Sequence, residues 1–296
     1  MTQPRFGRLL TAMVSPFDAE GMLDLSRAQE LAQRLLDSSS DGLVVCGTTG
    51  ESPTIDYDDK VRLFSAILEV AGGTAPVIAN IGDNCTADSV DFARRVEKLG
   101  VDGVMAVVPY YNKPPQEGLY RHFSAIAAAV DVPLVLYNVP SRTVTNLDAE
   151  TTLRLAGVDN IVAVKEASGR LTQIASIIDG APPGFEVLSG NDEDTLPMMG
   201  LGATGVISVA SHVAGPLLAD MLAAQGGGDH TRALKIHLEL MPLFKALFMT
   251  SNPIMVKRAL DLAGFPVGDP RLPLVPATDE QTAELERVMR RIGLLT

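Results

Sequence analysis

Short apolar, β-branched runs alternate with amphipathic segments along most of the chain, and this alternation restricts the fold more than any other feature. We expect eight strands, within residues 8–14, 41–47, 75–82, 102–110, 132–140, 160–168, 185–192 and 203–210. Between them, apolar residues at spacings of three and four predict helices, for example at 25–36, 58–70 and 89–99. Repeated strand–helix units of this number favour an α/β fold, the (β/α)8 TIM barrel.

An open, doubly wound sheet is the alternative arrangement of such units. No GxGxxG or P-loop motif follows the first run, and eight strands are many for that class. After residue 225 the glycine-rich segment "QGGGDH" precedes three helical stretches without strands, at about 230–249, 253–263 and 279–292. We therefore expect a catalytic barrel at 1–225 and a C-terminal helical domain at 226–296.

The composition narrows the class of protein. The formal net charge of −12 gives no electrostatic footprint for nucleic acid or for an anionic membrane. No apolar run is long enough to cross a membrane, and the N-terminus lacks the pattern of a signal peptide, so we expect a cytoplasmic protein. The two cysteines, Cys46 and Cys85, have no metal or redox spacing and are expected to be reduced, packed thiols.

The histidines do not indicate a metal centre. The chain has four, and they form no cluster with ligand spacing: His122, His212, His230 and His237. His230 and His237 stand seven residues apart on an expected helix, and we interpret them as surface residues. The sequence therefore predicts no metal site.

One lysine stands where an ammonium is unfavourable. Of the seven lysines, Lys165 alone ends a β-branched apolar run, "IVAVKEASG". In a barrel, this end of the strand faces the active site. Burial there lowers the pKa of an amine and leaves its lone pair free. A neutral amine facing a keto substrate forms a Schiff base, and the protonated imine then acts as an electron sink.

Other polar residues are expected at the same end of the barrel, after strands two, four, five and seven, in "GTTGE", "PYYNKP", "YNVPSRT" and "SGND". Each has an ordinary interpretation when taken alone. Thr48 and Thr49 suit a turn, Tyr137 a packed ring, and Arg142 the surface. Their convergence with Lys165 on one barrel face favours an active site.

Five motifs occur in a characteristic order: "GTTGESPT", "PYYNKPPQEGLYRHF", "YNVPSRT", "VKEASG" and "LSGNDE". On these motifs the chain resembles the 4-hydroxy-tetrahydrodipicolinate synthase (dihydrodipicolinate synthase) family, from about Leu9 to the C-terminal helices. The resemblance implies a (β/α)8 barrel with three C-terminal helices, assembled as a homotetramer (a dimer of dimers). It also implies a reaction without cofactor or metal, the condensation of pyruvate with L-aspartate 4-semialdehyde on the diaminopimelate route to lysine.

The resemblance assigns catalytic roles to four residues. Lys165 would form the covalent imine with pyruvate. Tyr137 would relay protons, and Thr48 and Tyr111 would complete a hydroxyl relay. Tyr111 would reach across a subunit interface.

The resemblance also assigns binding roles. Thr48 and Thr49 would hold the pyruvate carboxylate, and Arg142 would bind the carboxylate of the semialdehyde. Gly190 and Ile207 would line the pocket with backbone groups.

Two related enzyme classes share the fold and the lysine. N-acetylneuraminate lyases usually carry a serine in the first motif and lack the arginine after the tyrosine, whereas Thr48 and Arg142 match the synthases. Keto-deoxy-sugar aldolases are the next alternative. A catalytically inactive barrel that serves as a binding or regulatory protein is a third alternative. It is disfavoured by the joint presence of Lys165, Tyr137, Thr48, Tyr111 and Arg142.

In lysine-inhibited members of the family, a cleft at the tight-dimer interface binds the amino acid. The matching positions here are Ser52, Pro53, Tyr57, Lys60, Asn84, Asp88 and Tyr110. Strongly inhibited members carry histidine in place of Lys60 and glutamate in place of Asp88. Because a second ammonium opposes the side chain of bound lysine, we expect weak or absent inhibition by L-lysine.

Overall fold

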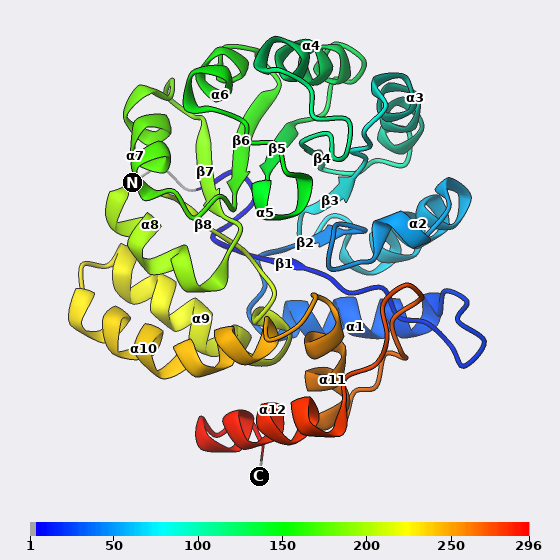
Figure 1. Ribbon diagram of the computed structural model, residues 1–296, viewed down its shortest axis with the longest axis vertical. Coiled ribbons are helices and arrows are strands. Elements are labelled where there is room, and N and C mark those ends of the chain that lie inside the picture. The colour runs from blue at the N-terminus through cyan, green and yellow to red at the C-terminus, as the bar shows by residue number, and fades with distance from the viewer. Residues whose placement is uncertain (1–3, 296) are drawn as a thin grey trace.

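Eight parallel strands, paired in sequence order, close into one barrel in the computed structural model, which describes residues 4–295 (Figure 1). Each expected run contains one strand, so the predicted (β/α)8 barrel is confirmed. The strands are β1 (Leu9–Ala12), β2 (Gly42–Val45), β3 (Val77–Asn80), β4 (Gly103–Val107), β5 (Leu134–Asn138), β6 (Ile161–Glu166), β7 (Glu186–Ser189) and β8 (Gly205–Ser208).

Helices surround the barrel, and further helices lie together on one side of it (Figure 1). They are α1 (Leu25–Asp37), α2 (Tyr57–Ala71), α3 (Thr86–Glu97), α4 (Gln116–Ala127), α5 (Pro140–Thr143), α6 (Ala149–Ala156), α7 (Leu171–Gly180), α8 (Thr195–Leu201), α9 (Ser211–Gly226), α10 (His230–Leu247), α11 (Ile254–Leu262) and α12 (Asp279–Arg291), with short 3₁₀ turns η1 (Ser52–Thr54) and η2 (Asp192–Asp194).

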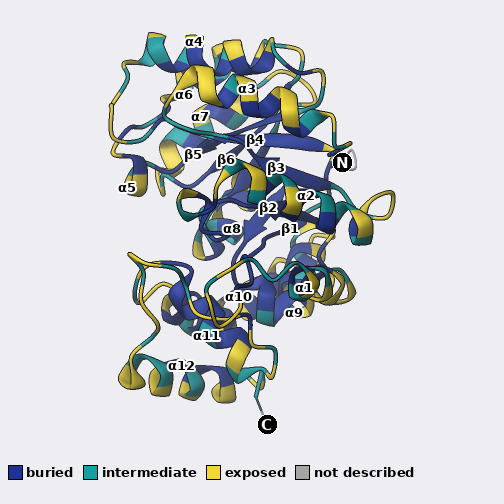
Figure 2. Ribbon diagram, turned by 90° about the vertical axis from the view of Figure 1, so that its right-hand side faces the viewer, coloured by how far each residue is buried: buried dark blue, intermediate teal, exposed yellow. Residues whose placement is uncertain are grey.

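The strands are buried on both faces, as their continuous apolar runs require (Figure 2). Inward-facing side chains such as Val44, Val135 and Leu188 fill the interior of the barrel. Outward-facing side chains such as Leu43 and Leu136 pack in a second cluster with the helices. Because successive strand residues alternate between these faces, the barrel interior is apolar up to its mouth.

Capping side chains explain where several helices begin. Asp24 accepts a hydrogen bond from the Arg27 N–H at the start of α1, and Asp56 caps α2 in the same way. Helix α3 starts at Thr86, three residues before its expected start at 89. Its N-cap residue, Cys85, makes no capping hydrogen bond, so the sequence carries no start signal there.

The C-terminal part contains α10, α11 and α12. Helix α10 packs on α9, and α12 contacts both α10 and α11. These helices fall at the three stretches expected from the sequence, while the division of the chain at 225/226 stays a prediction. No helix within residues 4–295 is long and apolar enough to cross a membrane.

Two expectations about single residues are wrong. The side chain of His237 is buried, because it shares the inner face of α10 with Leu240 and Phe244, whose ring lies 5.9 Å away. Cys85 is exposed, because it precedes α3 at a solvent-facing helix start. His230 is exposed and Cys46 is buried, as expected.

Candidate active site

The carboxyl ends of the strands bring the expected residues to one mouth of the barrel. Thr48 and Thr49 follow β2, Tyr137 lies near the end of β5, and Lys165 lies near the end of β6. Arg142 is in the short helix α5 that follows β5. Parallel strands end at the same edge, so turns far apart in sequence meet there.

Lys165 is buried inside the barrel, with 5% of its surface exposed. Its Nζ atom lies 4.3 Å from the centre of the Tyr137 ring. Burial lowers its pKa to about 7; the Asp192 carboxylate opposes this decrease and the Arg142 guanidinium adds to it. A large fraction of Lys165 is therefore a neutral amine, which is the nucleophilic form.

Cross-strand pairing aligns Lys165 with Tyr137. The two residues are direct partners between β5 and β6, and Asn138 pairs with Glu166 at the next position. The Asn138 amide donates to both carboxylate oxygens of Glu166, at 3.0 and 3.2 Å, and Glu166 also accepts from the Ser168 N–H at 2.7 Å. This buried pair was not predicted, although a carboxylate next to the lysine in a β-branched run was a signal for it.

Gly190 and Ile207 lie beside the lysine and within the barrel, respectively. A Cβ atom at Gly190 would lie 2.7 Å from the Cβ of Ala167 and 3.2 Å from the Cγ of Lys165, so only glycine fits. Ile207 is buried in the interior cluster of the barrel. Both positions therefore limit the space around Lys165.

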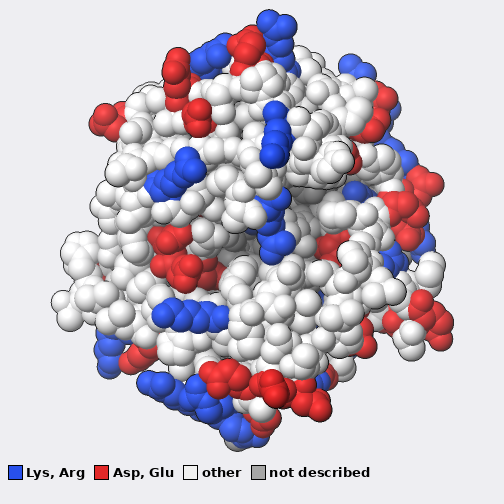
Figure 3. Space-filling model, in the orientation of Figure 1, with Lys and Arg blue, Asp and Glu red and all other residues white. Residues whose placement is uncertain are grey.

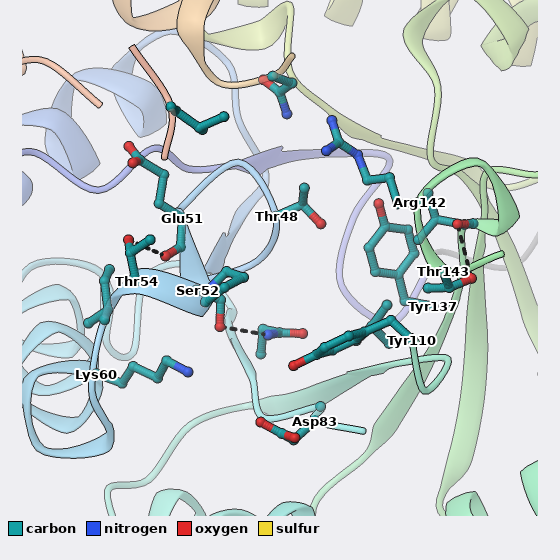
Figure 4. Close-up of a pocket in the computed structure, with 18 of the residues that line it drawn as sticks. Thr48, Glu51, Ser52, Thr54, Lys60, Asp83, Tyr110, Tyr137, Arg142 and Thr143 are labelled. Atoms are coloured by element: carbon teal, nitrogen blue, oxygen red, sulfur yellow. Dashed lines mark hydrogen bonds between the residues drawn. The ribbon is translucent and has the colours of Figure 1, made fainter. Parts of the chain in front are cut away.

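Tyr137 lies between Thr48 and Arg142 (Figure 4). All three residues line a cavity of about 670 Å³. Burial raises the pKa of Tyr137, while a hydrogen bond with Thr48 and the charge of Arg142 oppose the increase. The Tyr137 hydroxyl is therefore protonated at neutral pH and lies near the Thr48 hydroxyl, which lines the cavity.

Thr49 follows Thr48 in the turn after β2 and is buried. Its Oγ1 accepts a hydrogen bond from the Asn252 amide at 2.8 Å. Asn252 lines the same cavity and belongs to the C-terminal part of the chain. No role was predicted for Asn252, because 203 positions separate it from Thr49.

Tyr111 is not brought to this cavity. Its side chain is 90% exposed, and its backbone has a φ of +73° in the loop after β4. The resemblance expects Tyr111 to act across a subunit interface, and an outward-pointing side chain is compatible with that role. Its part in the relay stays a prediction.

Asp192 is a second buried group whose role was not predicted from the sequence. Its carboxylate accepts hydrogen bonds from the Ser208 hydroxyl at 2.5 Å and from the N–H groups of Val209 and Ala210 at 3.1 and 2.8 Å. Burial raises the pKa of Asp192, and these three donors oppose the increase. The "SGND" motif placed an acid near the pocket, but only the fold reveals its charge interaction with Lys165.

The cavity continues from the catalytic residues towards the expected lysine cleft (Figure 4). Five cleft positions line it: Ser52, Pro53, Tyr57, Lys60 and Tyr110. Asn84 and Asp88 do not, although the Asn84 amide donates to the Tyr110 carbonyl at 3.2 Å. Asp83, which the sequence did not single out, does line the cavity and lies 3.3 Å from the Tyr57 hydroxyl.

The surface around the barrel carries both signs of charge. Figure 3 shows a hollow near the middle of one face, with acidic and basic side chains around it. Among residues 4–295, no group of three or more His, Cys, Asp or Glu side chains is placed to hold a metal ion. The expectation of a reaction without metal stays a prediction.

Known proteins match this chain along almost its whole length. The model of the dihydrodipicolinate synthetase family matches residues 5–292. The 4-hydroxy-tetrahydrodipicolinate synthase of Moorella thermoacetica is 55% identical over 98% of this chain and 100% of its own length. That of Symbiobacterium thermophilum is 54% identical over 99% and 100%.

Solved structures of this family superpose on the chain as well. A dihydrodipicolinate synthase from Cyanidioschyzon merolae with lysine bound superposes with a TM-score of 0.97 and 45% identity, covering 99% of this chain and 100% of that one. A dihydrodipicolinate synthase from Bacillus anthracis gives a TM-score of 0.95 at 43% identity, covering 97% and 99%.

Proposed function

Because the chain belongs to the dihydrodipicolinate synthetase family, we propose that Lys165 forms an imine with pyruvate and that this adduct condenses with L-aspartate 4-semialdehyde. The activity is that of a 4-hydroxy-tetrahydrodipicolinate synthase, a lyase of lysine biosynthesis through diaminopimelate. One observation carries the role of Lys165: it is a buried lysine at the mouth of the barrel with a pKa of about 7.

The proposed steps use the neutral amine and the protonated tyrosine. The Lys165 amine adds to the keto carbon of pyruvate, and water leaves to give the imine. The protonated imine draws electrons from the methyl group, which loses a proton to form an enamine. The enamine carbon attacks the aldehyde, whose oxygen takes a proton and becomes the 4-hydroxyl. The amine that came from L-aspartate 4-semialdehyde then displaces Lys165 from the imine carbon, which closes the ring and frees the lysine.

Proton transfers need a relay that reaches the covalent adduct. Tyr137 lies directly beside the Lys165 amine, and its hydroxyl interacts with Thr48 on the cavity side. This chain of groups supports Tyr137 and Thr48 as the relay. Tyr111 would complete the relay from a neighbouring subunit.

The two substrate carboxylates need separate donors. Thr48 and Thr49 lie on the turn after β2, where their hydroxyl and N–H groups suit the small pyruvate carboxylate. Arg142 lies further out on α5 and lines the cavity. Its planar guanidinium suits two parallel hydrogen bonds to a carboxylate, so we assign it to the semialdehyde.

We further propose a homotetramer in the cytoplasm that needs neither metal nor cofactor. Assembly differs among relatives, since one solved structure is described as a monomeric dihydrodipicolinate synthase variant. Light scattering of the purified chain tests the tetramer, and turnover in the presence of a chelator tests the independence from metal.

The cleft residues that line the cavity would be the site for L-lysine, which is bound in the C. merolae structure. In this chain Lys60 occupies the cavity, 5.1 Å from the centre of the Tyr57 ring. We therefore propose that the cleft is present but binds L-lysine weakly.

Borohydride trapping tests the covalent step. Incubation with pyruvate and borohydride should add one reduced pyruvyl group, and peptide mapping should place it on Lys165. Lys235→Met removes an exposed lysine and should still be labelled, whereas Lys165→Met should not. A label on a different lysine, or none, would refute the mechanism. Turnover of pyruvate with the semialdehyde, beside an assay with N-acetylneuraminate, tests the choice of substrate.

A further inference from the structure

The turn that carries Thr48 and Thr49 is held by the C-terminal part of the chain. Thr49 Oγ1 accepts a hydrogen bond from Asn252 Nδ2 at 2.8 Å, and both side chains are buried. Asn252 lies two residues before α11, outside the strands and helices of the barrel. The C-terminal part therefore contacts the site directly.

A second contact fixes the same turn from its other end. Glu51 has left-handed backbone geometry, with a φ of +54°, and its carboxylate is buried. One carboxylate oxygen lies 2.7 Å from the Lys257 amine, and the other accepts from the Arg271 N–H at 2.8 Å. Because Thr49 is two positions from Glu51, this anchor restricts the turn that carries the Thr49 hydroxyl.

The contact with Asn252 decides which way the Thr49 proton points. An amide N–H can only donate, so the Thr49 oxygen is the acceptor in this pair. The single hydroxyl proton must then point elsewhere. Asn252 lines the cavity, and its Oδ1 is buried and has no hydrogen-bond partner among residues 4–295. Among these residues, Thr49 is therefore the only hydrogen-bond partner of the Asn252 side chain.

We propose that Asn252 is a positioning residue that presents the Thr49 hydroxyl as a hydrogen-bond donor to the pyruvate carboxylate. The inference rests on the proposed function, in which Thr49 binds that carboxylate. An oriented hydroxyl needs no reorganisation when the anion arrives, and a hydrogen bond to a charged acceptor is stronger than one to a neutral acceptor.

The test is a double-mutant cycle on the full-length protein. Asn252→Ala should raise the KM for pyruvate about tenfold and change the KM for the semialdehyde by less than about twofold. In a Thr49→Val background, Asn252→Ala should have almost no further effect on the KM for pyruvate, because the hydroxyl that it orients is gone. Additive effects, or equal changes in both KM values, would overturn the inference.

Two further variants keep the test decisive. Asn252→Asp keeps the size of the side chain but replaces the donor by acceptors, so Thr49 must donate to it. This variant should bind pyruvate more weakly than Asn252→Ala, and unchanged pyruvate binding would overturn the inference. Thr250→Ala, in the same segment and without a side-chain hydrogen bond among residues 4–295, is the matched control.

Borohydride trapping separates this inference from the proposed function. If the unmodified chain forms no pyruvate adduct on Lys165, the proposed function fails. If the adduct forms and Asn252→Ala leaves the KM for pyruvate unchanged, only the role of Asn252 fails.

Discussion

Two lysines of this protein are almost equally buried and have similar neighbours, yet one suits catalysis and the other suits a structural ion pair. Lys165 is 5% exposed inside the barrel, and Lys257 is 3% exposed on α11. Each amine lies over an aromatic ring, Lys165 at 4.3 Å from the centre of Tyr137 and Lys257 at 4.1 Å from that of Phe17. Burial lowers the pKa of both.

The difference between the two lysines is the ion pair. Lys257 lies 2.7 Å from a Glu51 carboxylate oxygen, and its amine donates to the Asp269 carbonyl at 3.3 Å. Among residues 4–295, no carboxylate forms such a pair with Lys165, and the nearby Asp192 already accepts three hydrogen bonds. Lys165 therefore differs from Lys257 in lacking an ion-pair partner that would stabilise its protonated form.

Lys165→Met should have the largest effect, and it should change activity and stability in opposite directions. Without a nucleophile there is no imine, so turnover should fall by at least about 10⁴-fold, as measured with pyruvate and the semialdehyde. The variant should also resist unfolding better than the parent, because a desolvated amine has been removed from the barrel. Loss of both activity and stability would mean that Lys165 has a structural role.

The pH dependence of that stabilisation has a definite sign. Between about pH 7 and 10.5 the unfolded chain holds a proton on Lys165 that the folded chain lacks. The gain from Lys165→Met should be constant below pH 7 and should shrink as the pH rises towards 10.5. Thermal unfolding of both proteins across this range is the measurement.

Tyr137→Phe makes the surroundings of Lys165 resemble those of Lys257, which lies over Phe17. The ring stays and only the hydroxyl is lost. A positioned acid–base group contributes about 10²–10⁴-fold, so kcat should fall by that factor while the pyruvate adduct still forms. A kcat within about threefold of the parent would assign Tyr137 to packing alone.

Lys257→Met should show the reverse of the Lys165 result. It leaves the Glu51 carboxylate buried without its partner, and breaking such a pair costs about 3–5 kcal/mol of the free energy of unfolding. Denaturant unfolding measures this loss, and Glu51→Gln in the same chain should restore part of it. A loss below about 1 kcal/mol would place this pair among those of little energetic value.

The pH profile tests the free amine of Lys165. Because its pKa is lowered to about 7, kcat/KM for pyruvate should be level above about pH 8 and fall about tenfold per unit well below pH 7. Asp192→Asn removes the carboxylate that raises this pKa, so the acid limb should move to lower pH. A profile that does not shift would remove Asp192 from the charge balance of the site.

Local sequence patterns were sufficient to predict the barrel. All eight strands are buried on both faces and therefore appear as apolar runs between amphipathic helices. Lys165 could also be identified, because burying an ammonium at the end of such a run is unfavourable and its presence there indicates a functional role. The buried residues that were not predicted carry no such signal. Lys257, for example, lies in a helical pattern where a lysine is ordinary.

Contacts between distant parts of the chain could not be predicted in this way. Thr49 meets Asn252 across 203 positions, and Glu51 meets Arg271 across 220. The lysine cleft shows the same limit, since Asp83 lines the cavity and Asp88 does not. They are five positions apart in sequence, and only the geometry of the β3–α3 connection distinguishes them.

Lys60, the third buried lysine, extends the comparison to regulation and has the smallest expected effect. Its amine lies over the Tyr57 and Phe92 rings, at 5.1 and 5.8 Å, rather than in solvent. The amine of a bound L-lysine would approach this charge. Two ammonium groups about 4 Å apart repel by about 4 kcal/mol at an effective dielectric constant near 20.

We therefore expect little or no inhibition by millimolar L-lysine. Solvent and salt screen part of the repulsion, but even half of it weakens binding more than tenfold. Lys60→His should introduce inhibition, because a neutral imidazole removes the opposing charge, and Lys60→Arg is the matched control that keeps it. The measurement is a titration of L-lysine at fixed substrate concentrations. Half-inhibition of the parent below about 1 mM would show that the Lys60 amine moves out of the cavity, and would separate it from the two fixed lysines.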